Sequence, residues 1–429
     1  MTSDSAARAG RGMPWLVVSG VLLAAVSLRG PIVAPTPVLS QIESDLGIGP
    51  ATAGLLTTAP VLMFAVLTPV AALVIRRAGA ELALLLSLSG VLAGTFVRAL
   101  PGFGWMLAGM IVIGASITIG NVVIPVIIRR DVPSARVALV TAAYAATLNV
   151  GSLLTSLLTA PIAAVIGWQL ALLVWSGITV AGVVLWGIHL RRSRVAGTDG
   201  DERYSGDPPP PRTTDAHRRP DLDASQLTGP LPVIGRHERS LLRRPVAWLL
   251  TAAFAMQCTI YYALTTWLPT LTADELGLDA AAAGALSSLY QGAGIAGAFL
   301  IPLLIRYTPR LVPALTICAS WIIVTVGILL WPELMWVWLI AGAVGHAGGF
   351  VVIFTTLVGV ARSDAEAAGM SALVQGGGYA VAALGAPFMG WLHEVTGGWN
   401  AALAVMVALA LVYCVALLAA VAAAQRARR

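Results

Sequence analysis

The stretch that decides the fold is PWLVVSGVLLAAVSLRGPIVAPTPV, residues 14–38. It is apolar almost throughout, and Arg29 is its only charged residue. A helix needs roughly 20 apolar residues to cross a bilayer core, so this stretch is long enough to span a membrane. It is too long for the apolar core of a cleavable signal and is followed by further apolar runs. We therefore expect it to be the first of a series of transmembrane helices.

Eleven further runs have the same apolar character, which gives twelve predicted spans in all. Pro and Gly occur inside many of them, and membrane bundles tolerate this because neighbouring helices satisfy the freed backbone groups. The further runs cover about 51–75, 81–100, 104–128, 137–163, 168–190, 246–271, 280–305, 311–331, 334–361, 366–391 and 399–424.

The composition supports a membrane protein. Hydrophobic residues make up 58% of the chain and charged residues only 11%, with a mean hydropathy of +0.85. A soluble domain carries about 25% charged residues. The net charge is +6 and every basic residue is Arg. Because the arginines fall in short gaps between apolar runs, they indicate membrane topology and not nucleic-acid binding.

The gaps alternate in charge along the chain. Acidic residues such as Glu43 follow the first run, whereas Arg76 and Arg129 follow the second and the fourth. Basic loops stay in the cytoplasm, so we expect an even number of spans with both termini cytoplasmic. The membrane that we expect is the cytoplasmic membrane of a bacterium. Arg98 is the one arginine on the side predicted to be outside.

Residues 191–245 interrupt the series of spans. They are rich in charge and contain the run Pro208–Pro211, and their apolar content is too low for a folded domain. We expect a disordered cytoplasmic linker between a bundle at 1–190 and a bundle at 246–429; a regulatory segment is the alternative.

The two bundles resemble each other in sequence. Leu46-Gly47 and Ala53-Gly54 recur 230 residues later as Leu276-Gly277 and Ala283-Gly284. Such symmetry is typical of a two-lobe carrier, whose substrate lies between the lobes near the membrane midplane. We therefore predict an all-α membrane protein with two pseudo-symmetric six-helix bundles.

Arg29 is the strongest candidate for a substrate contact. An Arg at a helix centre costs about 2.5–3.5 kcal/mol on insertion scales. No Asp or Glu lies deep in any predicted span to pair with it. A guanidinium binds planar anions through several donors in a fixed fork, so an anionic substrate group is one candidate partner. Helix carbonyls near the Gly30-Pro31 break are the other.

Neutral polar side chains at a similar predicted depth are the remaining candidates for the substrate site. They suit hydrogen bonding to a small polar solute, although such residues also join helices to one another. His346, which lies well inside a span, is a candidate for carrying a co-transported proton or for lining the cavity. The other members of this layer are Asn121, Tyr144, Asn149, Gln257, Tyr261, Tyr262, Gln291, Gln375 and Tyr379.

Several segments together resemble a known family. They are residues 28–31 with 46–58, 120–133, 267–269, 371–379 and 397–399. On these the chain resembles the major facilitator superfamily, and within it the cyanate and nitroimidazole permease (CynX/NimT) group. The resemblance implies a monomeric secondary transporter for a small anion or polar organic molecule. The superfamily's loop between helices two and three usually carries an Asp where this chain has Arg76.

The sequence therefore predicts a secondary transporter, with a small-molecule substrate and the lipid bilayer as its partners. No nucleotide loop, metal cluster or catalytic triad is visible, so we expect no cofactor, no metal and no enzyme activity. The closest alternative is a multidrug efflux antiporter on the same fold. That function usually needs an acid within the membrane. A channel or receptor is a more distant alternative.

Overall fold

The computed structural model describes residues 15–201, 243–309 and 311–426. Twelve helices or helix groups in these ranges are long and apolar enough to span a membrane, which confirms the predicted number of spans. The first half of the chain (residues 15–201) contains α2 (Trp15–Val33), η1 (Thr36–Val38), α3 (Leu39–Leu46), α4 (Pro50–Ala78), α5 (Ala80–Val97), α6 (Phe103–Asp131), α7 (Ser134–Ile166), α8 (Trp168–Val174) and α9 (Ser176–Asp201).

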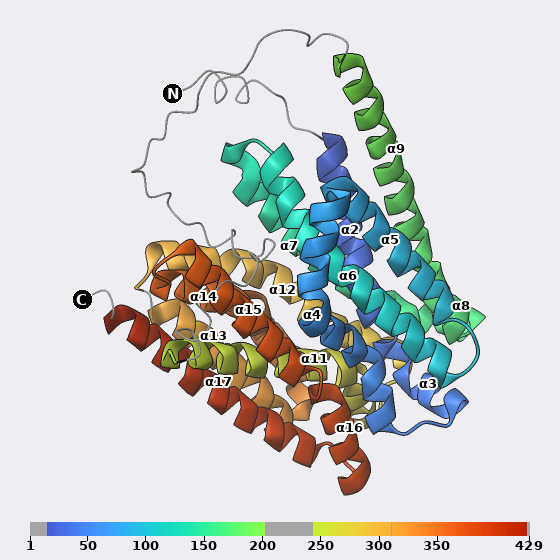
Figure 1. Ribbon diagram of the computed structural model, residues 1–429. Helices are drawn as coiled ribbons and strands as arrows, with labels where there is room; N and C mark the ends of the chain where they lie inside the picture. The colour runs from blue at the N-terminus through green and yellow to red at the C-terminus, as the bar shows by residue number, and fades with distance from the viewer. Residues whose placement is uncertain (1–14, 202–242, 310, 427–429) are drawn as a thin grey trace.

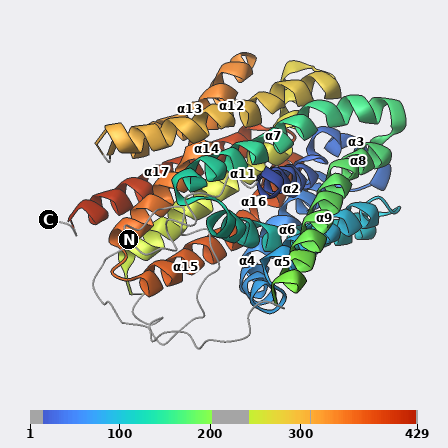
Figure 2. The ribbon, with the colours of Figure 1, turned by 90° about the horizontal axis from the view of Figure 1, so that it is seen from above.

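The second half (residues 243–426) repeats this pattern of six spans. It contains α11 (Pro245–Leu276), α12 (Ala280–Tyr307), α13 (Leu311–Leu330), η3 (Pro332–Leu334), α14 (Met335–Val360), α15 (Asp364–Ala382), α16 (Gly385–Thr396) and α17 (Asn400–Arg426). The two halves lie side by side, the first in blue to green and the second in yellow to red (Figure 1). Viewed from above, α7 lies along the boundary next to α12 (Figure 2).

The repeated Leu-Gly pairs have the same structural role in both halves. Gly47 ends α3 and Gly277 ends α11, and both have left-handed backbones, with φ of 62° and 64°. Glycine adopts this conformation without the steric penalty that a Cβ atom brings. The sequence repeat therefore marks equivalent turns after the first span of each half.

The helix of the sixth span continues into the predicted linker. The candidate span itself ends at Arg191, close to the predicted bound, whereas helix α9 runs on to Asp201, so the first part of the segment expected to be disordered is helical. Most of that segment, residues 202–242, lies outside the described residues.

The first span is not one continuous helix. Helix α2 contains Pro31 and stops at Val33, and the chain continues through η1 and α3 to Leu46. Pro35 directly precedes η1, and Pro37 lies within it. Neither residue has a backbone N–H group that could donate a hydrogen bond. The equivalent first span of the second half, α11, is a single helix.

The halves contact each other closely at the end where Gly47 and Gly277 lie, which we call the closed end. A Cβ atom added to Gly54 in α4 would lie only 2.8 Å from the Ala386 carbonyl oxygen. The Thr266 hydroxyl of α11 donates a hydrogen bond to Thr57 of α4 over 2.7 Å. Small residues and one hydroxyl pair therefore join α4 to the second half.

Two more glycines bring the halves together at the closed end. A Cβ atom on Gly284 of α12 would lie 2.7 Å from the Ser156 carbonyl oxygen of α7. A Cβ atom on Gly390 of α16 would lie 2.5 Å from the Pro50 carbonyl oxygen of α4. In Figure 1, α16 lies beside α3 and α4, whereas the far ends of α7 and α14 diverge.

The loop between α4 and α5 contains an ion pair in spite of its unusual sequence. Arg130, at the end of α6, lies 2.5 Å from Glu81 and 2.7 Å from Asp131. Arg76, which replaces the superfamily's usual Asp, is exposed. Glu81 therefore supplies the negative charge at this loop, and the pair joins elements of the same half.

Candidate functional site

Arg29 lies midway along the first span and faces the second half of the molecule. Its guanidinium carbon is 4.9 Å from the ring centre of Tyr261 and 5.9 Å from that of Tyr262. A cation over an aromatic face gains about 0.5–2 kcal/mol. Within the described ranges, no carboxylate forms a salt bridge with Arg29. The residue as a whole is half-buried.

Three aromatic rings stack next to this arginine. The Tyr261 ring centre lies 5.0 Å from that of His346 at an interplanar angle of 30°, and 6.2 Å from that of Tyr290 at 28°. The Tyr290 and His346 rings are 4.7 Å apart. The His346 Nε2 atom is 3.2 Å from the Tyr290 carbonyl oxygen, so this nitrogen carries the proton in the bond. The stack joins α11, α12 and α14.

Amide side chains of the second half are placed around the stack. The Tyr261 hydroxyl donates to the Gln291 Oε1 atom over 3.4 Å, and the Gln291 amide donates to Thr265 over 3.4 Å. Gln257 is buried and packs against Gly349, and its Oε1 atom accepts no hydrogen bond within the described chain. An unpartnered buried carbonyl oxygen favours a ligand or water that can donate to it.

Tyr379 connects this region to the first half. Its ring makes edge contacts with Phe64 of α4 at 5.5 Å and with Phe254 of α11 at 5.1 Å. Gln375, one turn before it, donates a hydrogen bond to Ser371 over 2.8 Å within α15. Both side chains are half-buried.

The predicted residues of the first half make fewer contacts. Tyr144 is buried and lies close enough to Arg29 to interact with its charge. Asn121 and Asn149 are half-buried, and no side-chain hydrogen bond joins either of them to the rest of the described chain. The structure therefore groups Arg29, Tyr261, Tyr262, Gln291 and His346 directly. The ring contacts of Tyr379 are with Phe64 and Phe254, and the two asparagines stay outside the contacts that define the group.

Two contacts of the site were not predicted. Tyr290 is fully buried in the aromatic stack, and its hydroxyl has no hydrogen-bond partner within the described chain. Its position directly before Gln291 was the available signal. Phe64 is apolar, so nothing in the sequence distinguished it from a packing residue.

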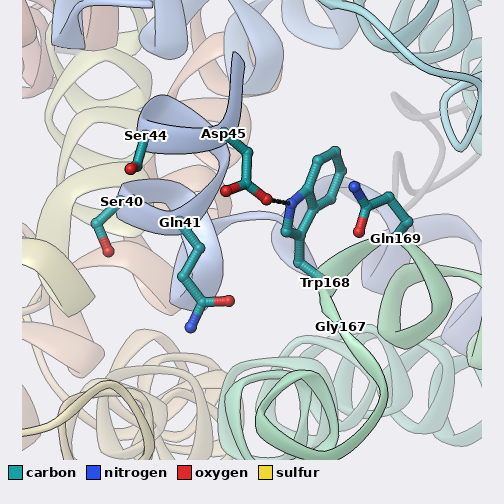
Figure 3. A pocket seen from close by; sticks show the side chains of 7 residues that line it. All are labelled: Ser40, Gln41, Ser44, Asp45, Gly167, Trp168 and Gln169. Carbon is teal, nitrogen blue, oxygen red and sulfur yellow. Dashed lines mark hydrogen bonds between the residues drawn. The ribbon is translucent and has the colours of Figure 1, made fainter. Parts of the chain in front are cut away.

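A polar hollow lies elsewhere, at the closed end of the first half (Figure 3). It has a volume of about 430 Å³ and is lined by Ser40, Gln41, Ser44, Asp45, Gly167, Trp168 and Gln169. The Trp168 Nε1 atom donates to the Asp45 carboxylate over 2.6 Å. All its lining residues belong to one half, so this hollow does not provide a site shared between the halves.

The Trp–Asp bond at this hollow is repeated in the second half. The Trp399 Nε1 atom donates to the Asp274 carboxylate over 2.9 Å. In each half the tryptophan begins or immediately precedes the sixth span, and the aspartate lies at the end of the first span. The pair therefore fastens the first span to the sixth span in both bundles.

Comparison with known proteins agrees with this architecture. A family model described as Major Facilitator Superfamily matches residues 17–371. The chain belongs to the major facilitator superfamily. It is thus an integral, multi-pass membrane protein and a transporter of this superfamily's type, with the two six-helix halves for which the superfamily is known.

Among curated proteins, the chain is 32% identical to the 2-nitroimidazole transporter of Escherichia coli (strain K12), with 90% of each chain covered. It is 29% identical to the uncharacterized transporter YycB of Bacillus subtilis (strain 168), covering 92% of this chain and 90% of that one. It is 23% identical to the cyanate transport protein CynX of Escherichia coli (strain K12), covering 88% and 90%. The predicted resemblance is therefore confirmed.

Solved structures share the fold at low sequence identity. A mutant of the nucleoside transporter NupG matches with a TM-score of 0.71 and 12% identity, over 94% of this chain and 99% of that one. A bacterial homologue of the human lysosomal transporter Spinster, in an inward-facing and occupied conformation, matches with a TM-score of 0.67 and 17% identity, over 97% and 98%.

Proposed function

We propose that this transporter carries a small, planar, anionic or strongly electronegative solute, which Arg29 binds between the two halves. The observation that carries the proposal is the position of the guanidinium. It lies against Tyr261 and Tyr262 of the opposite half without a carboxylate partner among the described residues. Hydrogen bonds to charged groups contribute about 1.5–3 kcal/mol, so bonds from the guanidinium would stabilise a bound anionic group.

The surroundings of Arg29 favour a flat solute. The rings of Tyr261 and His346 offer aromatic groups beside the cation, and Gln257 offers an unpartnered carbonyl oxygen to a donor. A planar heterocycle with an electronegative substituent would use the cation, the rings and the amides together. A compact linear anion would use mainly the cation. The planar heterocycle corresponds to the 2-nitroimidazole, and the linear anion to the cyanate, for which two curated relatives are named.

Transport would follow by alternating access. Arg29 belongs to the first half and its tyrosines to the second, so a bound solute would contact both halves. The halves are in close contact at the closed end, where Gly54 meets Ala386. With both termini in the cytoplasm of a bacterial cell, this arrangement corresponds to an inward-open state of a monomer in the cytoplasmic membrane.

An ion gradient would drive the cycle, and His346 is the proposed proton carrier. Its ring lies in the stack beside Arg29's tyrosines, and only its Nε2 atom has a hydrogen-bond partner in the described chain. In His346→Gln the amide can still donate to the Tyr290 carbonyl but cannot titrate. If uptake by this variant kept the full pH dependence of the wild type, His346 would be excluded from coupling.

Counterflow into proteoliposomes tests the function. We expect vesicles loaded with unlabelled 2-nitroimidazole or cyanate to accumulate the corresponding labelled solute, and saturation to set this behaviour apart from that of a channel. The rival proposal, a multidrug efflux antiporter, predicts counterflow of a cationic dye such as ethidium. Dye counterflow without counterflow of either small solute would overturn the proposal.

A further inference from the structure

Arg98, which directly follows α5, is a buried charged residue that has no part in the candidate site. The sequence placed it on the outer side of the membrane, whereas its side chain is completely buried in the structure. Within the described chain it forms no salt bridge. Burying a guanidinium without an ionic partner costs free energy. The hydrogen bonds that the buried group makes have to offset this cost.

Arg98 donates hydrogen bonds to carbonyl groups at two breaks in neighbouring helices. One terminal nitrogen lies 2.6 Å from the Pro31 carbonyl oxygen and 3.6 Å from the Met110 sulfur. The other lies 3.3 Å from the Leu172 carbonyl oxygen. The side chain therefore connects α5 with the first span, α6 and α8.

The Pro31 carbonyl lacks a helical partner for a covalent reason. In an α-helix it would accept the backbone N–H of the residue four positions later. That residue is Pro35, which has no N–H group. The Arg98 side chain provides the donor that the backbone cannot.

The Leu172 carbonyl is in a similar position. Leu172 lies in the last turn of α8, which ends at Val174, and the chain resumes as α9 at Ser176. The last four carbonyl groups of a helix have no partner within it. One guanidinium thus satisfies carbonyl groups at the breaks of both the first and the sixth span.

The second half of the chain provides an internal comparison. At the repeat offset of 230 residues, Pro31 corresponds to Tyr261 and Pro35 to Thr265, so the backbone donor is present there. The first span of that half, α11, is continuous. The end of α13 that corresponds to Arg98, residues 328–331, carries no charged residue. The arginine therefore occurs in the half whose first span is broken.

The break also determines where Arg29 lies, because Pro31 is only two residues further along. On its other side this part of α2 is held by close packing on α7. A Cβ atom on Gly151 would lie 3.0 Å from the Val26 carbonyl oxygen, and one on Gly30 would lie 3.2 Å from Thr155. Arg98 anchors the remaining side.

We propose that Arg98 is a positioning residue that holds the break of the first span, and through it Arg29, by binding the Pro31 and Leu172 carbonyl groups. This role does not depend on the solute that Arg29 binds. It makes a specific prediction for Pro35, because an alanine there would supply the missing N–H and make the bond from Arg98 to Pro31 redundant.

Hydrogen–deuterium exchange on the purified full-length protein in detergent tests the proposal. We expect Arg98→Met to accelerate exchange about tenfold or more in the peptides covering 30–38 and 172–178, since charge-assisted bonds are lost at both. Adding Pro35→Ala should restore slow exchange in 30–38 but not in 172–178. Pro125→Ala, which removes a helix proline at the other end of α6, is the control and should restore neither.

Three results would overturn the proposal. They are unchanged exchange in both peptides of Arg98→Met, equal acceleration in the distant helix α13, and no recovery at 30–38 with Pro35→Ala. Arg98→Lys keeps the charge but has one nitrogen in place of the two terminal guanidinium nitrogens that bind the two carbonyl groups. It should protect at most one of the two peptides, and it carries the same comparison if Arg98→Met does not fold. Full protection of both peptides in Arg98→Lys would also contradict the proposal.

Discussion

Replacing Gly54 with alanine should force the closed end of the transporter apart. The added Cβ atom would lie 2.7 Å from the Pro387 nitrogen and 2.8 Å from the Ala386 carbonyl oxygen. Ordinary contacts begin near 3.4 Å, so α4 and α16 would have to separate by about 0.7 Å. Both atoms are backbone, so no side-chain rotation can make room.

The expected size of this effect follows from the cost of overpacking, about 1–3 kcal/mol. If the cost falls only on the state in which this end is closed, the ratio of closed to open molecules drops about 5- to 150-fold. Spin labels at Ser44 and Val395, which are both exposed and lie on opposite halves, would report the change as a longer distance. Cys258, Cys318 and Cys414 would first be replaced.

Gly104→Ala is the matched control, because nothing lies within 4 Å of the position of its added Cβ atom. It should leave the distribution of distances as in the wild type. If Gly54→Ala also left that distribution unchanged, the packing of α4 on α16 would not limit closure and the reasoning would be refuted.

Two further predictions concern stability. Trp168→Phe removes the hydrogen bond to the Asp45 carboxylate and should lower the free energy of unfolding by about 1.5–3 kcal/mol, measured by thermal unfolding against the exposed control Trp105→Phe. An equal loss in both variants would show that the bond contributes nothing. Tyr290→Phe removes a buried hydroxyl without a partner in the described chain and should raise the unfolding temperature, while the exposed control Tyr307→Phe should not. A lower unfolding temperature for Tyr290→Phe would mean that its hydroxyl is satisfied by water or ligand.

The spans were predictable because a bilayer imposes length and hydropathy on every one of them. The repeated pairs Leu46-Gly47 and Leu276-Gly277 indicated the two-half architecture, since equivalent turns need the same glycine. Arg29 stood out because a charge at mid-span is expensive wherever it points.

Which side chains from different helices meet at the candidate site could not be predicted to the same degree. It depends on how each helix is rotated, and apolar helices with little amphipathicity do not reveal their rotation in sequence. Asn149 and Tyr261 looked equally suitable, yet only Tyr261 joins the stack with His346. The sequence position of Arg98 indicates its depth in the membrane, which led to its assignment to the outer side. It does not indicate that the side chain binds the Pro31 and Leu172 carbonyl groups.

The most direct test of the central claim is the affinity of the purified protein for 2-nitroimidazole and for cyanate, measured by thermal shift in the wild type, Arg29→Gln and Arg29→Lys. Loss of one charge-assisted bond predicts that Arg29→Gln weakens binding about 10- to 150-fold, with Arg29→Lys recovering part of it. Equal affinity in all three proteins would assign Arg29 to structure and contradict the account.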